Sequence, residues 1–347
     1  MAEGEKFNWR LTAVWWMILL VGAMYLMLMT ATKKTIVIAD SSNGKETAGE
    51  QYAVRQELLL ESVVNEDGAF WIPLEKNTKA GNVVVENSYQ DRELRIFIGG
   101  AQEQFYENCV VQGAVETIVK ADYEIQRSGV LIRLQMDSVY EFQTSMDGEI
   151  LKIQSNKPQE LYSMVVVIDP AECDKISLTE NGTEAEEVTL AVCRLLSEQW
   201  DMEGVKLYFT RTAERSASDE ERKALSDAVE ADVYIRLDVA EAEDSSLYGI
   251  RGCYNEEYFI PDFGNVELAD ILTRNVTVAA DNRAVGLAVA EDKENVLYKL
   301  EIPAASIELG YLSNEKECLL MGQETYRQKL ADGVKAAVKE VYSNYYE

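Results

Sequence analysis

The longest apolar segment of the chain lies near its N-terminus. The stretch LTAVWWMILLVGAMYLMLMTAT, residues 11–32, carries no charge. As an α-helix rising 1.5 Å per residue it would span roughly 33 Å, enough to cross one bilayer. A signal peptide would have a shorter apolar region followed by an A-x-A-like cleavage site, and the sequence shows no such site here. We therefore expect an uncleaved transmembrane helix at residues 11–32, preceded by a short tail at residues 1–10.

A different pattern, with apolar residues at every second position, characterises residues 35–158. The segment RELRIFIGG places a leucine and two isoleucines on one face, and GVLIRLQM has similar strand character. Asp147 and Gly148 separate YEFQTSM from EILKIQS as the turn of a hairpin would. Five or more short strands without an amphipathic helix predict a small β-sandwich, and the polar stretch SNKPQE at residues 155–160 is a suitable linker.

Strands alternate with helices over residues 161–345. The apolar run MVVVID, then KLYFTR, DVYIRLDV and IPAASIEL, read as buried strands. Two capping boxes, Thr183 with Glu186 and Ser218 with Glu221, mark helix starts, and TYRQKLADGVKAAVKEVY reads as a closing helix. This order predicts an α/β domain with a mainly parallel sheet and flanking helices. Functional groups are expected at the carboxyl ends of its strands.

Composition restricts the chemistry that these domains can perform. The net charge of −28 argues against binding to nucleic acid, whose phosphates attract cations. The chain has no histidine, so no imidazole can act as a zinc ligand or general base. Its five cysteines are odd in number and form no CxxC pair, so we expect no disulfide framework.

Five blocks of the C-terminal region together resemble a known family. In order they are VVIDP, a capped helix, LYFTRT, SDEERKALSDAVEADVYI and IPAASIELGYLSNEKE. They are similar to the zinc-dependent N-acetylmuramoyl-L-alanine amidases that cut peptidoglycan, over about residues 163–343. The most specific element, IELGYLSN, resembles the E-x-G-F-x-S-N signature of that family. The resemblance implies an extracytoplasmic location for residues 33–347, which makes residues 1–10 cytoplasmic.

The β-rich region also has a counterpart. By pattern and position, residues 35–158 resemble an AMIN domain, which implies peptidoglycan binding or placement at the envelope. A spacer fold or a protein-binding domain is the alternative, because a fold does not fix a function.

The resemblance also implies site residues, and here the sequence departs from the family. The family has a histidine ligand after I-D-P, where this chain has Glu172. A glutamate ligand falls on Ala185, with Glu184 one position away, and a second histidine ligand falls on Asp238. The catalytic glutamate, the general base of the family, is retained as Glu308.

Several hypotheses follow for this altered site. Carboxylates suit hard cations better than zinc, so Glu172, Asp238 and Glu308 form one candidate oxygen site. Alternatively an internal ion pair replaces the metal, because Arg236 lies two positions before Asp238 and shares its strand face. Both side chains would instead reach solvent if they behaved as most charged residues do. Cys173 is a candidate soft ligand, although a single thiol is weak support for zinc.

Two further residues have a structural and a functional interpretation. Arg211, in the segment TRT, matches a family arginine near the cleft, or it pairs with an acid of the fold. Asn314 follows the signature glutamate, where a backbone-capping role is the favoured interpretation.

These observations predict a membrane-anchored envelope protein whose amidase-like domain is catalytically inactive and needs no cofactor. Its partner would be peptidoglycan or an envelope protein, and its role would be to bind peptidoglycan or to regulate wall remodelling. The alternative is an active amidase, in which Glu308 is the general base and carboxylates or Cys173 hold zinc. A structural assembly subunit that acts through its β-rich domain is a third hypothesis.

Overall fold

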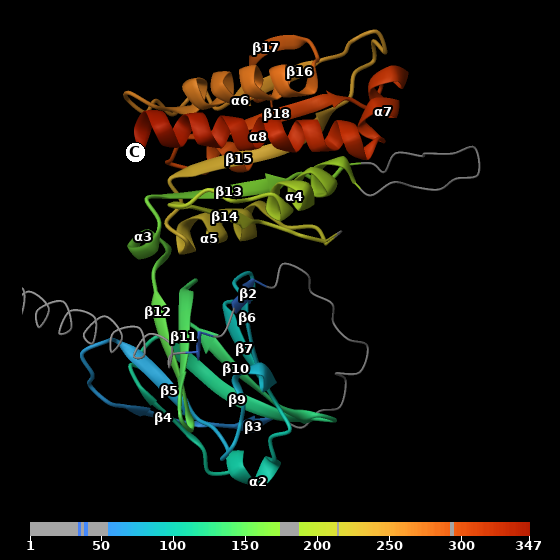
Figure 1. Ribbon diagram of the computed structural model, residues 1–347. Helices are drawn as coiled ribbons and strands as arrows, with labels where there is room; N and C mark the ends of the chain where they lie inside the picture. The colour runs from blue at the N-terminus through green and yellow to red at the C-terminus, as the bar shows by residue number, and fades with distance from the viewer. Residues whose placement is uncertain (1–33, 36–37, 41–54, 174–186, 214, 292–294) are drawn as a thin grey trace, which may run out of the picture.

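The computed structural model describes residues 34–35, 38–40, 55–173, 187–213, 215–291 and 295–347. The transmembrane helix predicted at residues 11–32 lies outside this set. Within the described ranges, no helix is both long enough and apolar enough to cross a membrane. Two bodies are present, a β-sandwich and an α/β domain, and they are joined by the short helix α3 (Figure 1).

The first body consists of two six-stranded sheets. One has the strand order β1-β11-β12-β5-β8-β4 and the other has the order β2-β6-β7-β10-β9-β3. In the first sheet the strands are β1 Lys34–Thr35, β4 Leu59–Ser62, β5 Ala69–Pro73, β8 Val110–Gly113, β11 Glu141–Asp147 and β12 Ile150–Asn156. In the second they are β2 Ile38–Asp40, β3 Gln56–Glu57, β6 Val83–Ser88, β7 Glu93–Gly99, β9 Ile118–Gln126 and β10 Gly129–Met136. Two short helices, η2 Ala80–Asn82 and α2 Glu103–Tyr106, complete this body.

The period-two pattern produces the core of this sandwich. Leu94, Ile96 and Ile98 alternate along β7 and are fully buried, in one apolar cluster with residues of the opposite sheet such as Phe70. The predicted hairpin is confirmed, because β11 pairs antiparallel with β12 and Gly148 has a φ of 59° in the turn between them. The prediction of a β-sandwich is thus confirmed, while the resemblance to an AMIN domain remains a prediction.

The second body is built on one six-stranded sheet of order β14-β13-β15-β18-β16-β17. The strands are β13 Met164–Pro170, β14 Val205–Phe209, β15 Val233–Ala240, β16 Ile250–Tyr254, β17 Ala284–Val289 and β18 Ala304–Tyr311. The pairs β14–β13, β13–β15, β15–β18 and β16–β17 are parallel, but β16 runs antiparallel to β18. The sheet is therefore mixed, and the predicted mainly parallel arrangement does not hold for the pair of β16 with β18. The reason is the connection from β15 to β16 at residues 241–249, which reverses the chain without the crossover helix that a parallel strand requires.

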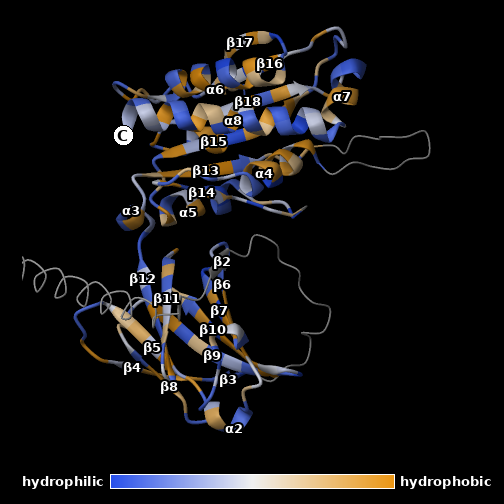
Figure 2. Ribbon diagram, in the orientation of Figure 1, coloured by the Kyte–Doolittle hydropathy of each residue, from blue (hydrophilic) through white to orange (hydrophobic). Residues whose placement is uncertain are grey.

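Helices cover both faces of this sheet. They are α3 Pro158–Leu161, α4 Val188–Glu198, α5 Asp219–Ala228, α6 Asn265–Ala280, η3 Val296–Tyr298, α7 Glu315–Met321 and α8 Glu324–Tyr345. Helices α4, α6 and α8 share one apolar cluster with the sheet, and η3 and α5 pack on its other face. Hydrophobic residues gather along β13 and β15 between these layers (Figure 2). Such double coverage explains why MVVVID is an uninterrupted apolar run.

One of the two predicted helix starts lies in the described residues. Ser218 accepts a hydrogen bond from the backbone N–H of Glu221, and the Glu221 side chain accepts one from the backbone N–H of Ser218. The predicted capping box at α5 is therefore confirmed. The box at Thr183 and Glu186 lies outside the described residues, and the described helix that follows it begins at Val188.

Candidate functional site

The carboxyl ends of β13, β15 and β18 bring charged side chains together at one edge of the sheet. In the strand register, Asp169 of β13 lies opposite Arg236 of β15, and Asp238 lies opposite Glu308 of β18. Glu172 follows directly after β13 at the same edge. Four of the residues singled out in the sequence, Glu172, Arg236, Asp238 and Glu308, thus lie at this edge, which we call the carboxylate edge.

Asp169 is the buried centre of the carboxylate edge, and its side chain is fully inaccessible. One of its oxygens accepts hydrogen bonds from Thr210 at 2.5 Å and from Nε of Arg222 at 2.9 Å. The other accepts one from Arg236 at 2.6 Å. Burial alone would raise the pKa of Asp169, but the guanidinium groups of Arg236 and Arg222 outweigh burial and hold the pKa below its usual value.

Glu172, at the first implied ligand position, pairs with an arginine from α5. Its Oε2 accepts a hydrogen bond from Arg222 at 2.6 Å, and its Oε1 accepts one from the backbone N–H of Ala217 at 3.1 Å. Burial acts to raise the pKa of Glu172, but these hydrogen bonds and the nearby arginines lower it overall. The carboxylate is therefore stabilised as an anion by these partners.

Asp238, at another implied ligand position, contacts the arginine two residues before it. Nε of Arg236 lies 3.4 Å from Oδ2 of Asp238, and the other carboxylate oxygen accepts the backbone N–H of Val239 at 2.8 Å. Arg236 points inward, with only 13% of its side chain exposed, and bridges Asp238 to Asp169. Burial raises the pKa of Asp238 and the neighbouring Glu308 adds to this effect, while Arg236 opposes it.

Glu308 forms the most regular ion pair of the carboxylate edge. Arg251 donates from Nε to Oε2 at 2.6 Å and from a terminal nitrogen to Oε1 at 2.8 Å. Arg251 belongs to β16 and lies opposite Glu308 in the antiparallel register. Arg251 was not predicted as a site residue, because β16 was not predicted as a neighbour of β18. The available signal was the apolar run around Arg251 in YGIRGCY, where one cation interrupts a short strand.

Arg211 lies deeper, behind the loop that follows β13. It donates to the carbonyl oxygens of Pro170 and Ala171, both at 2.7 Å, and to the carboxylate of Glu187 at 2.5 Å. Only 3% of the Arg211 side chain is exposed, and its pairing with Glu187 agrees with the structural interpretation of this residue. Glu187 was not predicted as its partner, and Ala185 and Glu184 lie outside the described residues.

The remaining candidates have local roles. Asn314 caps α7 by accepting hydrogen bonds from the backbone N–H groups of Lys316 and Glu317, each at 3.1 Å, which confirms its predicted role. Sγ of Cys173 lies 3.8 Å from the hydroxyl of Thr189, and burial raises the pKa of this thiol. A protonated thiol is a poor metal ligand.

The donor set does not fit a catalytic zinc ion. Such an ion needs about three protein ligands and an open position for water, and in most enzymes imidazole supplies part of the set. The sequence contains no imidazole, and arginines already bind the carboxylates at the positions that the resemblance implies. Throughout the portion that the structure describes, no group of three or more His, Cys, Asp or Glu residues is arranged to hold a metal ion.

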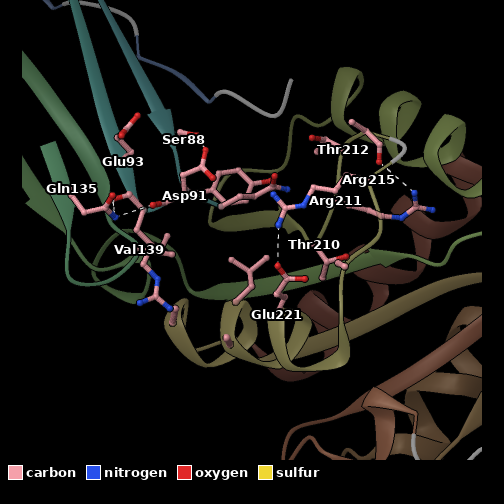
Figure 3. A pocket seen from close by; sticks show the side chains of 18 of the residues that line it. Ser88, Asp91, Glu93, Gln135, Val139, Thr210, Arg211, Thr212, Arg215 and Glu221 are labelled. Atoms are coloured by element: carbon pink, nitrogen blue, oxygen red, sulfur yellow. Dashed lines mark hydrogen bonds and ion pairs between the residues drawn. The ribbon is translucent and has the colours of Figure 1, made fainter. Parts of the chain in front are cut away.

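Two hollows lie near these residues. One, of about 380 Å³, opens beside the carboxylate edge and is lined by Glu172, Cys173, Val239, Glu241 and Leu312. A larger cavity of about 890 Å³ lies between the two bodies. Figure 3 shows its polar lining, with Ser88, Asp91, Glu93 and Gln135 on the sandwich side and Thr210 and Arg211 on the other.

The α/β domain has the amidase-like fold. Residues 166–340 match the sequence model of the N-acetylmuramoyl-L-alanine amidases, and the chain belongs to that family. Among curated relatives, the uncharacterized protein YqiI of Bacillus subtilis is 26% identical over 165 residues, which are 47% of this chain and 76% of YqiI. The N-acetylmuramoyl-L-alanine amidase CwlM of Mycobacterium tuberculosis is 27% identical over 141 residues, 40% of this chain and 34% of CwlM.

Two solved amidase structures are similar to this chain. An N-acetylmuramoyl-L-alanine amidase from Clostridium difficile 630 is 22% identical and superposes with a TM-score of 0.46, covering 52% of this chain and 98% of its own. The catalytic domain of the amidase CwlV from Bacillus (Paenibacillus) polymyxa is 19% identical with a TM-score of 0.45 and the same coverage. Both cover only about half of this chain.

Proposed function

We propose that this chain is a catalytically inactive amidase-family protein that binds peptidoglycan, or an envelope protein, without cutting the muramoyl-alanine bond. One observation carries the proposal. At the carboxylate edge an arginine holds each acid: Arg222 binds Glu172, Arg236 binds Asp238 and Arg251 binds Glu308.

The chemistry of these pairs argues against hydrolysis. A general base must be free to accept a proton from water, and both oxygens of Glu308 are engaged by Arg251. A guanidinium group supplies positive charge, but it offers no open coordination position at which the pKa of a water would fall to about 7. Arginines at this edge therefore replace the charge of a metal ion and not its catalytic action.

The proposal keeps a binding role for the domain. The hollow beside the carboxylate edge is lined by Glu172, Glu241 and apolar side chains, and it suits a peptide that carries an amino group. The membrane anchor at residues 11–32, with residues 33–347 outside the cell, is part of the same proposal. An anchored domain with such a hollow would hold a wall peptide or a partner near the membrane.

The test uses the full chain and three readouts. The first is zinc retained at pH 7 after free metal is removed, and the second is release of peptides from purified peptidoglycan. The third is sedimentation of the chain with the same peptidoglycan, which measures binding. We expect no retained zinc and no release, and equal binding by the wild type and the Glu308→Ala variant.

Retention of about one zinc per chain, with release that Glu308→Ala abolishes, would establish the active amidase instead. Absence of both release and sedimentation would leave an envelope protein as the partner, to be sought by crosslinking in cells. In either case the variant and the wild type are compared at a temperature at which both are folded, so that misfolding does not imitate loss of binding.

A further inference from the structure

Strand β17 forms an open edge of the α/β sheet. It is the last strand in the sheet order, and its sequence AVGLAV contains no charge and no proline. The side chains of Val285 and Leu287 are 41% and 40% exposed. In Figure 1 this strand lies at the end of the α/β domain farthest from the sandwich.

The opposite edge of the same sheet is covered. Strand β14 carries a lysine, Lys206, whose ammonium group lies 3.1 Å from the carboxylate of Glu141 in the sandwich. The backbone N–H and C=O of Phe209 are both bonded to the side chain of Tyr89, which also belongs to the sandwich body. Of the two edges, β14 is therefore protected by a charge and by a neighbouring domain, whereas no described residue gives β17 either protection.

An uncharged apolar edge strand is a template for another strand. Its outward N–H and C=O groups lack partners within the sheet, and proteins usually protect such edges with charges, prolines or bulges. Strand β17 has one such device, an irregular register against β16 near Gly286, whose φ is 115°. Pairing with an added strand would bury the exposed apolar side chains on either side of this glycine.

We propose that β17 pairs antiparallel with β17 of a second copy of this chain, about a two-fold axis at Leu287. The charged residues just outside the strand carry this choice of occupant. In this register Arg283 of each copy lies opposite Glu291 of the other, and Val285 lies opposite Val289. Both charged residues are exposed. Because β17 itself has no charged residue, this pairing places no two like charges opposite each other.

The same register makes a symmetric and local interface. Because the axis is two-fold, both Arg283–Glu291 contacts form at once, as in other isologous dimers. Each copy has a net charge of −28, which opposes association, so the contact needs the opposite charges that this register provides. A slip of two residues in either direction would separate Arg283 from Glu291.

The first test measures the mass of the full chain in solution, in mild detergent, as its concentration is raised from micromolar to millimolar. We expect a dimer that forms with concentration. Leu287→Lys places two like charges on the axis and should weaken the dimer at least tenfold. Val119→Lys is the matched control, since Val119 is 66% exposed on β9 of the other body.

A chain that stays monomeric over this range overturns the proposal. So does a dimer that Leu287→Lys leaves unchanged, because the contact must then lie elsewhere. A circular dichroism spectrum matching the wild type ensures that the lysine variant is folded.

The second test examines the register. Leu287→Cys should form an intermolecular disulfide with its own copy under mild oxidation, in excess of the unmodified chain and of Val119→Cys. Arg283→Glu should weaken the dimer by repulsion from Glu291, and the double variant Arg283→Glu with Glu291→Arg should restore it. Equal crosslinking of the two cysteine variants, or a double variant no better than the single one, overturns this register.

Discussion

Arg251 binds both carboxylate oxygens of Glu308, at 2.6 and 2.8 Å, across the antiparallel pair of β16 and β18. The glutamate that the family resemblance implies as the general base is therefore an acceptor in a fixed ion pair. Bidentate pairs of this kind add geometric specificity as well as energy. Under the proposed function, this pairing gives Glu308 a structural role.

Replacement of Arg251 by methionine should destabilise the fold. Glu308 is only 15% exposed, so loss of its partner would leave a desolvated carboxylate, at a cost of about 2 kcal/mol. The free energy of unfolding in urea measures this cost. The double variant Arg251→Met with Glu308→Gln should lose less than the sum of the single variants, and strictly additive losses would contradict the pairing.

Replacement of Asp169 by asparagine should be more damaging. Its carboxylate is fully buried and pairs with both Arg222 and Arg236, and breaking a buried pair of this kind typically costs about 3–5 kcal/mol. Asp227→Asn is the matched control, because Asp227 pairs with Lys223 on the surface, where the loss should stay below about 1 kcal/mol. Comparable urea midpoints for the two variants would refute the central role of Asp169.

The stability of the chain should fall in acid partly through Asp169. Because the pKa of this carboxyl is lower in the folded chain than its ordinary value, its contribution is complete above about pH 4 and is lost as the pH falls toward the folded pKa. Unfolding free energies measured from pH 6 down to pH 3 should therefore decline less steeply for Asp169→Asn than for the wild type. If the unfolding free energies of the two proteins fell in parallel with pH, protonation of Asp169 would not contribute to the loss of stability in acid.

The contact between the two bodies offers a further prediction. The hydroxyl of Tyr208 donates to Glu141 at 2.5 Å in a buried position, so Tyr208→Phe should cost about 1 kcal/mol and increase protease cutting near residues 155–163. Tyr140→Phe removes an exposed hydroxyl contact to Asp137 and is the control. Equal stability and equal cutting of the two variants would show that the Tyr208 contact does not hold the bodies together.

Local sequence patterns predicted much of the fold. The alternation that buries Leu94, Ile96 and Ile98 is visible without a structure, because strand periodicity is a property of neighbouring residues. The capping box at Ser218 is equally local. The antiparallel entry of β16 was not predicted, since it depends on how the chain returns after β15 and not on the composition of the strand itself.

The sequence pointed to the acidic residues of the candidate site but not to all of the arginines that pair with them. The family resemblance singled out Glu172, Asp238 and Glu308, and Asp238 lies opposite Glu308 because parallel strands present their carboxyl ends together. Arg222 and Arg251 were missed, for they come from a helix and from the antiparallel strand, 50 and 57 residues away from their partners in the chain.

By itself the sequence determined that no imidazole can bind a metal here, because it contains no histidine, and that apolar strands alternate with capped helices in the C-terminal half. Only the tertiary structure decided which guanidinium meets which carboxylate. Charged side chains carry no periodic signal of their partners, and the energy of a buried ion pair depends on distance and on the exclusion of water, which exist only once the strands are assembled.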